Sequence, residues 1–179
     1  VYIIYKAKDG DVFSPASLKA VLGIQDELIN FRSRLKEGEE SALEHLVKVD
    51  TLVNAPVLTV DGDVLLSKPL VGGTVPTSPE AITAIKAIAE TEKQLALQFF
   101  SRDHKYGGIQ IETDFGAIPV GAEEVTEETV LSLDQTASPD EAKPVEFKPT
   151  DQGDYLKLFE EIKKILEKPY GICLVVGPT

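Results

Sequence analysis

The alternation of apolar and polar positions along the chain predicts a set of strands. Residues 1–8 and 172–177 are apolar runs rich in β-branched side chains, which predicts strands buried on both faces at the centre of a sheet. Residues 107–114 alternate between apolar and polar side chains, so one face of this strand is expected to be buried and the other wet. Residues 95–101 are its expected partner in a hairpin on the flank of the sheet.

Helical periodicity predicts helices, two of which begin at a Ser-Pro pair. Ser14 and Ser78 suit the N-cap, and the proline after each suits the first helical position. The apolar stripe of the first helix comprises Leu18, Val21, Leu22, Leu28, Phe31 and Leu35, and that of the second Ile82, Ile85 and Ile88. A strongly amphipathic helix starts near Asp154, with acidic residues early and lysines late, as the helix dipole favours.

Two stretches interrupt these elements. Residues 36–94 contain short β-prone runs broken by prolines and the second Ser-Pro helix, and residues 115–151 are acidic and proline-containing. Without them the order is strand, helix, strand, strand, helix, strand, which is the ferredoxin-like split β-α-β arrangement of an α+β fold, with two helices on one face of the sheet. We therefore expect one domain with a core at 1–35, 95–114 and 152–177, an α/β insertion, and an acidic loop before the last helix.

Composition narrows the possible partners. The chain has 179 residues, 42% of them apolar, and its 18 basic and 30 acidic residues give a net charge of −12. Such a charge argues against binding to nucleic acid or to anionic lipid headgroups. The single cysteine, Cys173, lies in an apolar run and is interpreted as a small buried side chain. With no Cys/His cluster, we expect neither a metal nor a cofactor.

Asp-Gly-Asp occurs twice, at 9–11 and at 61–63, and raises the question of a cation site. A calcium loop of the EF-hand type needs an oxygen ligand at its fifth position and a glutamate at its twelfth. In both segments these positions hold an apolar residue or glycine. We therefore interpret the first as a turn that leads to the Ser14 cap, and the second as a hairpin turn.

No catalytic motif emerges, so no catalytic residues are predicted and the chain is not expected to be an enzyme. His45 and His104 have no partner base, nucleophile or metal spacing near them in the sequence. Glycine-rich phosphate loops and nucleophile-elbow motifs are also missing. An enzyme that uses the carboxylates of Asp9, Asp11 and Asp103 is the weakest of the three functional hypotheses that we carry.

The order of several short segments resembles one known family. The segment "VYIIYKAKDGDVFSPASLKAVLGIQDEL" resembles the start of the first extracytoplasmic loop of RND-superfamily exporters of the MMPL or hydrophobe/amphiphile type, with Phe13, Ser14 and Pro15 at the expected places. "LVKVDTLVNAP", "FFSRDHKYGGIQIETD" and "GICLVVGPT" follow in the order of that family. The resemblance covers nearly the whole chain, and its specificity comes from the succession of motifs.

This resemblance implies a function in membrane transport. It implies a non-catalytic, ferredoxin-like porter domain on the periplasmic side of the inner membrane of a bacterium, in a proton-driven exporter of lipidic, hydrophobic or amphiphilic compounds. The implied partners are the membrane helices and second periplasmic domain of the same transporter, its substrate, and possible further copies. We also expect an apolar helix to be encoded before Val1 and further spans after Thr179; proton-coupling residues would belong to such spans.

A substrate path is the only site that these expectations allow. Its predicted lining comprises Leu65, Leu66, Leu70, Val71, Phe99, Phe100 and Tyr106. Ordinary core packing is the alternative for each of these side chains. The alternative function is a stand-alone ferredoxin-like module that binds a ligand or another protein.

Overall fold

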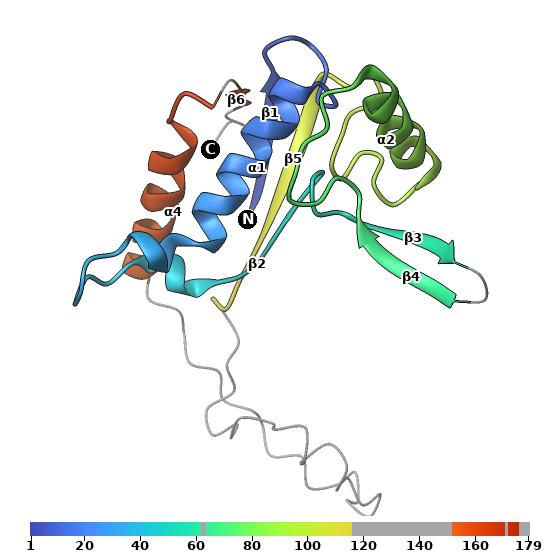
Figure 1. The fold of residues 1–179 in the computed structure, drawn as a ribbon. Coiled ribbons are helices and arrows are strands. Elements are labelled where there is room, and N and C mark those ends of the chain that lie inside the picture. Colours follow the sequence, from blue (N-terminus) through green and yellow to red (C-terminus); the bar gives the residue numbers. More distant parts are fainter. Residues whose placement is uncertain (62–63, 116–151, 171, 176–179) are drawn as a thin grey trace, which may run out of the picture.

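A computed structural model of the chain describes residues 1–61, 64–115, 152–170 and 172–175 (Figure 1). Its helices are α1 (Pro15–Ile29), α2 (Pro79–Thr91) and α4 (Gln152–Leu166), with short 3-10 helices η1 (Phe31–Arg34) and η2 (Ala42–His45). Its strands are β1 (Tyr2–Ala7), β2 (Leu46–Thr51), β3 (Pro56–Asp61), β4 (Val64–Pro69), β5 (Tyr106–Thr113) and β6 (Ile172–Val175). The described residues therefore form a mixed α+β protein.

The strands form two antiparallel sheets. The larger sheet has the order β2-β5-β1-β6. Ile4 of β1 lies opposite Gly108 of β5 on one side and opposite Val175 of β6 on the other, which makes β1 a central strand. β2 runs along the second half of β5, and β3 pairs with β4 in a separate sheet.

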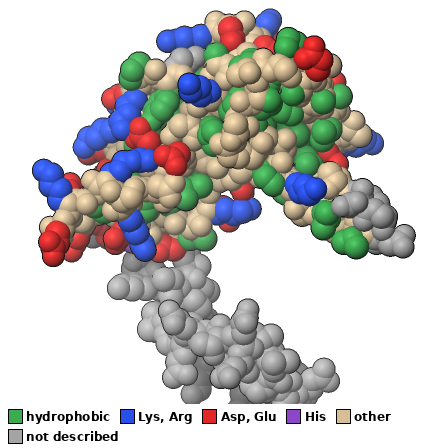
Figure 2. Space-filling model, in the orientation of Figure 1, with side chains coloured by type: hydrophobic (Ala, Val, Ile, Leu, Met, Phe, Trp, Pro, Cys, Tyr) green, Lys and Arg blue, Asp and Glu red, His purple; other side chains and the backbone are tan. Residues whose placement is uncertain are grey.

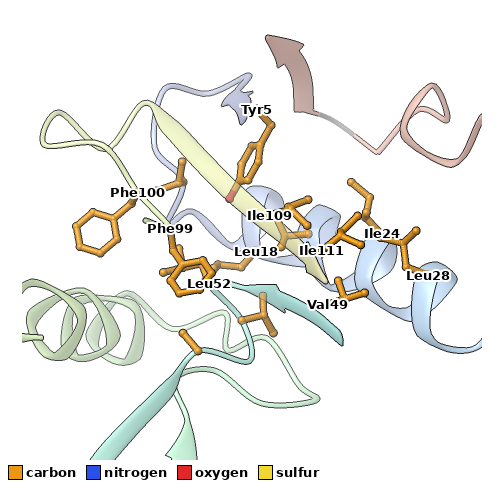
Figure 3. Close-up of a cluster of buried hydrophobic side chains, with 14 of the residues drawn as sticks. Tyr5, Leu18, Ile24, Leu28, Val49, Leu52, Phe99, Phe100, Ile109 and Ile111 are labelled. Atoms are coloured by element: carbon orange, nitrogen blue, oxygen red, sulfur yellow. The ribbon is translucent and has the colours of Figure 1, made fainter. Parts of the chain in front are cut away.

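Helices α1 and α4 lie side by side on one face of the larger sheet (Figure 1). The core fills the space between these helices and the sheet (Figure 3). It continues into the segment that follows β2, where Leu52, Val53 and Ala55 are buried. Side chains enter it from alternate residues of β1 and β5, as the two-residue period of a strand requires, and from one face of α1. Its fully buried members include Tyr5, Leu18, Val21, Ile24, Leu28, Leu52, Ile109, Ile111 and Leu158.

Both helix starts at a Ser-Pro pair are confirmed. The hydroxyl of Ser14 accepts a hydrogen bond from the Ser17 N–H at 3.1 Å, and that of Ser78 accepts one from the Ala81 N–H at 3.2 Å. The proline after each serine is the first residue of its helix. The amphipathic helix predicted near Asp154 is α4.

The predicted strand at 95–101 is wrong. In this segment Phe100 forms an isolated bridge to Gly107, and Leu97 has a φ of 68°, which a strand does not allow. Most of the expected place beside β5 is taken by β2, which comes much earlier in the chain. The apolar residues that suggested a strand are buried for another reason, because the segment turns into the core at Leu95 and Phe99.

The predicted positions of the strands need a second correction. β1 is central as expected, but β6 lies at the edge of the described sheet and β5 takes the other central position. Tyr2, Ile4 and Lys6 of β1 are exposed, so this strand is not buried on both faces. Tyr2, Ile4 and Lys6 are exposed because α1 and α4 cover only one face of the larger sheet. An apolar run in the sequence does not reveal whether one face of a strand or both will be covered.

The excursion from the sheet is shorter than predicted. The chain leaves the sheet after Thr51 and bonds to β5 again at Phe99, where the Phe99 carbonyl accepts the Gly108 N–H at 3.1 Å. The excursion thus spans 52–98 rather than 36–94. It holds α2 and the β3–β4 hairpin, which projects from the body (Figure 1) and is called the arm below. Apolar side chains are visible along the arm in Figure 2. Leu58, Val64 and Leu65, which belong to its two strands, are exposed.

Some expectations fall outside the described residues. In the arm Asp61 lies opposite Val64, which supports the predicted hairpin, but the two residues between them are not described. The predicted acidic loop, apart from its first residue Phe115, and the side chain of Cys173 are likewise outside the described part of the chain.

Candidate functional site

The predicted substrate path does not form a single surface. Leu65 and Leu66 lie on the arm, and Leu65 is exposed. Leu70, Phe99 and Phe100 are buried in the core, and Val71 packs against it, so ordinary packing was the correct interpretation for these residues. Tyr106 is partly exposed on the sheet face that α1 and α4 leave uncovered.

The buried members of that path are held by the backbone of the excursion. Leu70 donates its N–H to the Ala55 carbonyl at 2.8 Å, and Val71 donates its N–H to the Val53 carbonyl at 3.0 Å. These bonds extend the arm's ladder into the body and turn Leu70 inward. Sequence periodicity could not predict the burial of Leu70. The hydrogen bonds that place it join residues before β3 to residues after β4, and the orientation of this hairpin depends on how it packs on the rest of the protein.

The first Asp-Gly-Asp segment is a joint between β1 and α1. An Asp11 carboxylate oxygen accepts the Phe13 N–H at 2.9 Å, and an Asp9 oxygen accepts the Asp11 N–H and the Ser17 hydroxyl, both at 3.3 Å. Burial by itself would raise the pKa of Asp9, but hydrogen bonds from Ser14, Asp11 and Ser17 outweigh it and hold that pKa below its usual value. The predicted turn and cap are confirmed, and these carboxylates are occupied by their own loop.

Phe13 ties this joint to the turn before β5. Its ring lies edge-on to Phe100, with centroids 5.1 Å apart, and edge-on to His104 at 5.3 Å. The Val12 N–H donates to the His104 carbonyl at 2.8 Å. His104 Nε2 also lies 3.3 Å from a carboxylate oxygen of Glu90 in α2, so this histidine holds three segments together.

The other candidate side chains have similar structural surroundings. Asp103 accepts hydrogen bonds from the Ser101 hydroxyl at 2.6 Å and from the Lys105 N–H at 3.3 Å, and the Ser101 bond lowers its pKa. His45 Nδ1 lies 2.8 Å from Asp114, and its ring stacks on Phe115. Each histidine thus has a carboxylate partner that sequence analysis missed, because the two residues of each pair are far apart in the chain.

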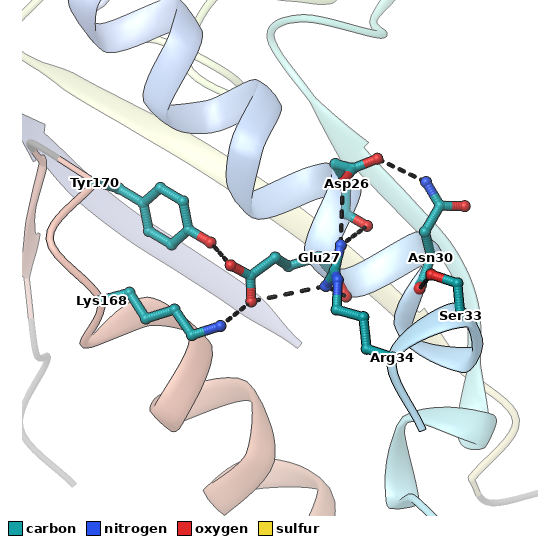
Figure 4. A network of polar contacts seen from close by, with 7 residues as sticks. All are labelled: Asp26, Glu27, Asn30, Ser33, Arg34, Lys168 and Tyr170. Atoms are coloured by element: carbon teal, nitrogen blue, oxygen red, sulfur yellow. Dashed lines mark hydrogen bonds and ion pairs between the residues drawn. The ribbon is translucent and has the colours of Figure 1, made fainter. Parts of the chain in front are cut away.

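The densest polar cluster joins the end of α1 to the segment after α4 (Figure 4). The Glu27 carboxylate accepts hydrogen bonds from the Lys168 ammonium and the Tyr170 hydroxyl, and Arg34 lies 3.7 Å from it. Arg34 also donates to the Asp26 carboxylate at 3.0 Å. The aromatic ring of Tyr170 fits here because its neighbour on α1 is a glycine: a Cβ at Gly23 would lie 3.0 Å from the ring.

These contacts make Glu27 an anchor. Burial by itself raises its pKa, but the hydrogen bonds from Lys168 and Tyr170 and the charges of Lys168 and Arg34 outweigh it and hold the pKa below the usual range. Burial and the Glu27 bond raise the pKa of the Tyr170 hydroxyl. An ionised carboxylate with its lone pairs in use holds α1 against the segment that leads into β6, and is poorly placed to accept a proton in a reaction.

Three of the hollows on the described surface are lined by none of the predicted path residues. The first, of about 470 Å³, is lined by Phe115, Gln152, Tyr155 and Leu156. A second, of about 420 Å³, lies between the first turns of α1 and residues 73–77, and a third, of about 280 Å³, between the end of α1 and the outer edge of β2. All three are shallow. The first two are mostly apolar, so they suit contact with an apolar surface better than chemistry, whereas Arg32, Glu44 and Lys48 also line the third.

No family model, curated protein or solved structure matches this chain. Within the described ranges there is no group of three or more metal-ligating side chains, and no described helix is both long and apolar enough to cross a membrane. Exposed apolar residues of the described surface include Leu58, Val64 and Leu65 on the arm and Tyr2, Ile4 and Tyr106 on the uncovered face of the larger sheet.

Proposed function

We propose that this chain is a porter-type extracytoplasmic domain of an RND-type exporter, and that its fold is the ferredoxin-like split β-α-β. In this proposal β1, α1, β2, β5, α4 and β6 are the six core elements. The observation that carries it is the strand order β2-β5-β1-β6 with all neighbours antiparallel and both helices on one face. The motif order along the chain supports the same assignment.

The proposed role is to form part of a path for lipidic or amphiphilic substrates and to contact other parts of the same transporter. Of the predicted lining, Leu65, Leu66 and Tyr106 remain candidates, because their side chains reach the surface or lie close to it. The partners in this proposal are membrane helices, a second periplasmic domain and the substrate, and the location is the periplasmic side of a bacterial inner membrane. No enzymatic step is proposed.

The proposal is tested by locating the domain in cells that express the whole gene. In a Cys173→Ser background, a cysteine introduced at Leu65 should react with a membrane-impermeant maleimide in intact cells, because this side chain is exposed on the arm. A cysteine at Leu18, which is buried, is the matched control and should stay unlabelled. Labelling at position 65 only after lysis would contradict an extracytoplasmic location.

The gene itself provides a second test. The proposal predicts an apolar segment of about 20 residues encoded shortly before Val1 and several such segments after Thr179. A gene without them would favour the alternative, a stand-alone ferredoxin-like module that binds a ligand or protein. The observation that supports this alternative is the exposed apolar residues of the arm, because such a surface suits the binding of a ligand or another protein.

A further inference from the structure

Helix α2 packs on the body with little apolar burial. Ala89 is its only buried residue, and Ile88 is 44% exposed. Ile82 and Ile85 are partly buried against the core. Because the free energy gained from burial is proportional to the apolar area removed from water, α2 gains less of it than α1 does. The polar contacts between α2 and the body therefore matter more for the docking of this helix.

Two side chains about one helical turn apart on α2 make ionic contacts with the body. Lys86 Nζ lies 3.7 Å from a carboxylate oxygen of Asp11 in the joint, and 5.8 Å from the centre of the Phe13 ring. Glu90, four residues later, has a carboxylate oxygen 3.3 Å from His104 Nε2. The first contact is an ion pair at neutral pH, whereas the second is an ion pair only when the imidazole is protonated.

The imidazole of His104 is held in front of Glu90 by its own backbone and by two aromatic rings. The residue has a φ of 57°, and its carbonyl accepts the Val12 N–H at 2.8 Å. The rings of Phe13 and Phe100 have their centroids 5.3 and 5.7 Å from that of the imidazole. With the side chain only 19% exposed, its packing determines its position, and its protonation determines the charge that Glu90 meets.

Charged side chains from three segments surround His104, and most of them are paired with one another. Lys105, in the same turn, lies 3.4 Å from Asp103, while Lys86 of α2 is paired with Asp11. The Glu90 carboxylate is therefore the group whose charge an imidazolium at this position complements. The set comprises Lys86 and Glu90 on α2, Asp9 and Asp11 in the joint, and Arg102, Asp103 and Lys105 in the turn.

We propose that protonation of His104 tightens the docking of α2 on the body, which makes the position of this helix sensitive to pH. Near neutral pH most histidines are uncharged, and the Lys86–Asp11 pair is the ion pair between α2 and the joint. In mildly acidic solution the His104–Glu90 pair is added. Because this attraction exists only while the helix is docked, docking strengthens as the pH falls through the range in which histidines titrate, and weakens as it rises.

The exposure of the His104–Glu90 pair limits the size of the effect. The Glu90 side chain is 50% exposed, so water and salt screen the attraction. Exposed ion pairs of this kind change an equilibrium constant by about two- to fivefold. We therefore expect a graded change in the docking equilibrium of α2, and a smaller change at high salt.

Amide hydrogen exchange of the 179-residue chain, followed residue by residue by NMR, is the first measurement. Protection factors are corrected for the pH dependence of exchange in an unstructured chain, so a change in them reports the opening of the helix. From about pH 7 to about pH 5.5, the protection factors of α2 should rise about two- to fivefold. Protection factors that stay constant or fall over this range would overturn the proposal.

Glu90→Gln and Lys86→Gln are matched variants, because each replaces one charge of α2 by a neutral amide, four residues apart on the same side of the helix. Glu90→Gln removes the carboxylate that faces His104, so the rise in protection on acidification should disappear. Lys86→Gln removes the contact to Asp11 and leaves the His104–Glu90 pair in place, so the rise should remain. A rise that survives Glu90→Gln, or that disappears in both variants, would show that this pair is not its origin and would overturn the proposal.

The chain has two histidines, and exchanging each one assigns the effect. His104→Asn introduces a residue that tolerates a positive φ and is not protonated in this range, so the rise should disappear, although the lost ring packing lowers protection at both pH values. His45→Gln changes the histidine that pairs with Asp114 at the opposite end of β5, so the rise should remain. If His45→Gln abolished the rise, the pH response would belong to the other histidine and the proposal would be wrong.

Discussion

Helices α1 and α2 begin with the same signal, a serine cap followed by proline, and then lie in different surroundings. α1 buries Leu18, Val21, Ile24 and Leu28 against the sheet, whereas Ala89 is the only residue of α2 that is buried. Their caps are alike in geometry, with hydrogen bonds of 3.1 and 3.2 Å.

The difference shows that a helix start and a helix environment have separate causes. The cap is a local interaction between residues three apart, so the sequence nearby is sufficient for it. Burial depends on which surface the helix meets, and α2 belongs to the excursion while α1 crosses the larger sheet. The predictions below make four comparisons of the body with the excursion through matched changes, and one of them is extended to its pH dependence.

The largest difference in stability between the body and the excursion is expected when an apolar side chain is truncated in each. Leu18→Ala in α1 should lower the free energy of unfolding by about 3 kcal/mol, because it leaves a cavity in a fully buried site. Ile88→Ala in α2 should cost under about 1 kcal/mol, since Ile88 is 44% exposed. Urea denaturation of both variants measures the two values, and equal losses would show that α2 is packed as tightly as α1.

Adding a methyl group should discriminate between the regions in the same way. A Cβ at Gly107 in β5 would lie 2.1 Å from the Tyr5 ring, whereas one at Gly73 in the excursion would meet nothing within 4 Å. Gly107→Ala should therefore destabilise the protein by about 1–3 kcal/mol or more, and Gly73→Ala should be nearly neutral. A neutral Gly107→Ala in thermal denaturation would mean that Tyr5 has room to move.

The Glu27 cluster should contribute more to the free energy of unfolding than the Lys86–Asp11 ion pair, which joins α2 to the body. Glu27→Gln should cost about 1–2 kcal/mol at neutral pH, because the hydrogen bonds to the carboxylate lose their charge. Lys86→Gln, which removes a 3.7 Å contact to Asp11 at the surface, should have little effect. Chemical denaturation at pH 7 compares these variants.

The pH dependence of the Glu27 effect follows from its lowered pKa. A carboxyl group whose pKa is lower in the folded protein than in the unfolded chain stabilises the fold fully above the unfolded value. This stabilisation is lost as the pH falls through the folded value. The stability gap between the parent and Glu27→Gln should therefore shrink from neutral pH into the acidic range below the usual glutamate pKa. A gap that is independent of pH would contradict the assigned role of the ionised carboxylate.

The smallest difference concerns the caps themselves. Ser14→Ala and Ser78→Ala each remove one hydrogen bond at a helix start, worth about 1 kcal/mol. We expect Ser14→Ala to lower global stability by about that amount, because α1 is part of the cooperative core. Ser78→Ala should act mainly on amide exchange within α2. A global loss from Ser78→Ala as large as that from Ser14→Ala would show that the excursion unfolds together with the body.

Local interactions made several features predictable. The two Ser-Pro caps, the turn at Asp9–Asp11, and β1, β5 and α4 depend on residues close together in the sequence or on a clear periodicity, and each is present in the structure. The apolar stripe predicted for the first helix was right in part: Leu18, Val21 and Leu28 are buried in α1. Ile24 was missed, and Phe31 and Leu35 lie beyond the end of α1 at Ile29. The family resemblance and the exporter function stay predictions.

Long-range pairing explains the errors. Residues 95–101 have the composition of a strand, yet β2 takes most of the place beside β5, because the choice depends on the competition of two segments for one edge. The burial of three predicted path residues has a related cause: Leu70, Phe99 and Phe100 are apolar enough for either a groove or a core, and only the packing of the body decides between them.

The amino-acid sequence by itself thus determined where the helices begin, how the first Asp-Gly-Asp segment turns, and the acidic character of the protein. The tertiary structure alone decided which face of β1 is covered, which carboxylate meets His45, His104 or Lys168, and where Leu97 is exposed. The first group depends on contacts within a few residues or on composition. The second depends on contacts between distant segments, whose free energies are small individually and select a partner only when the whole core is packed.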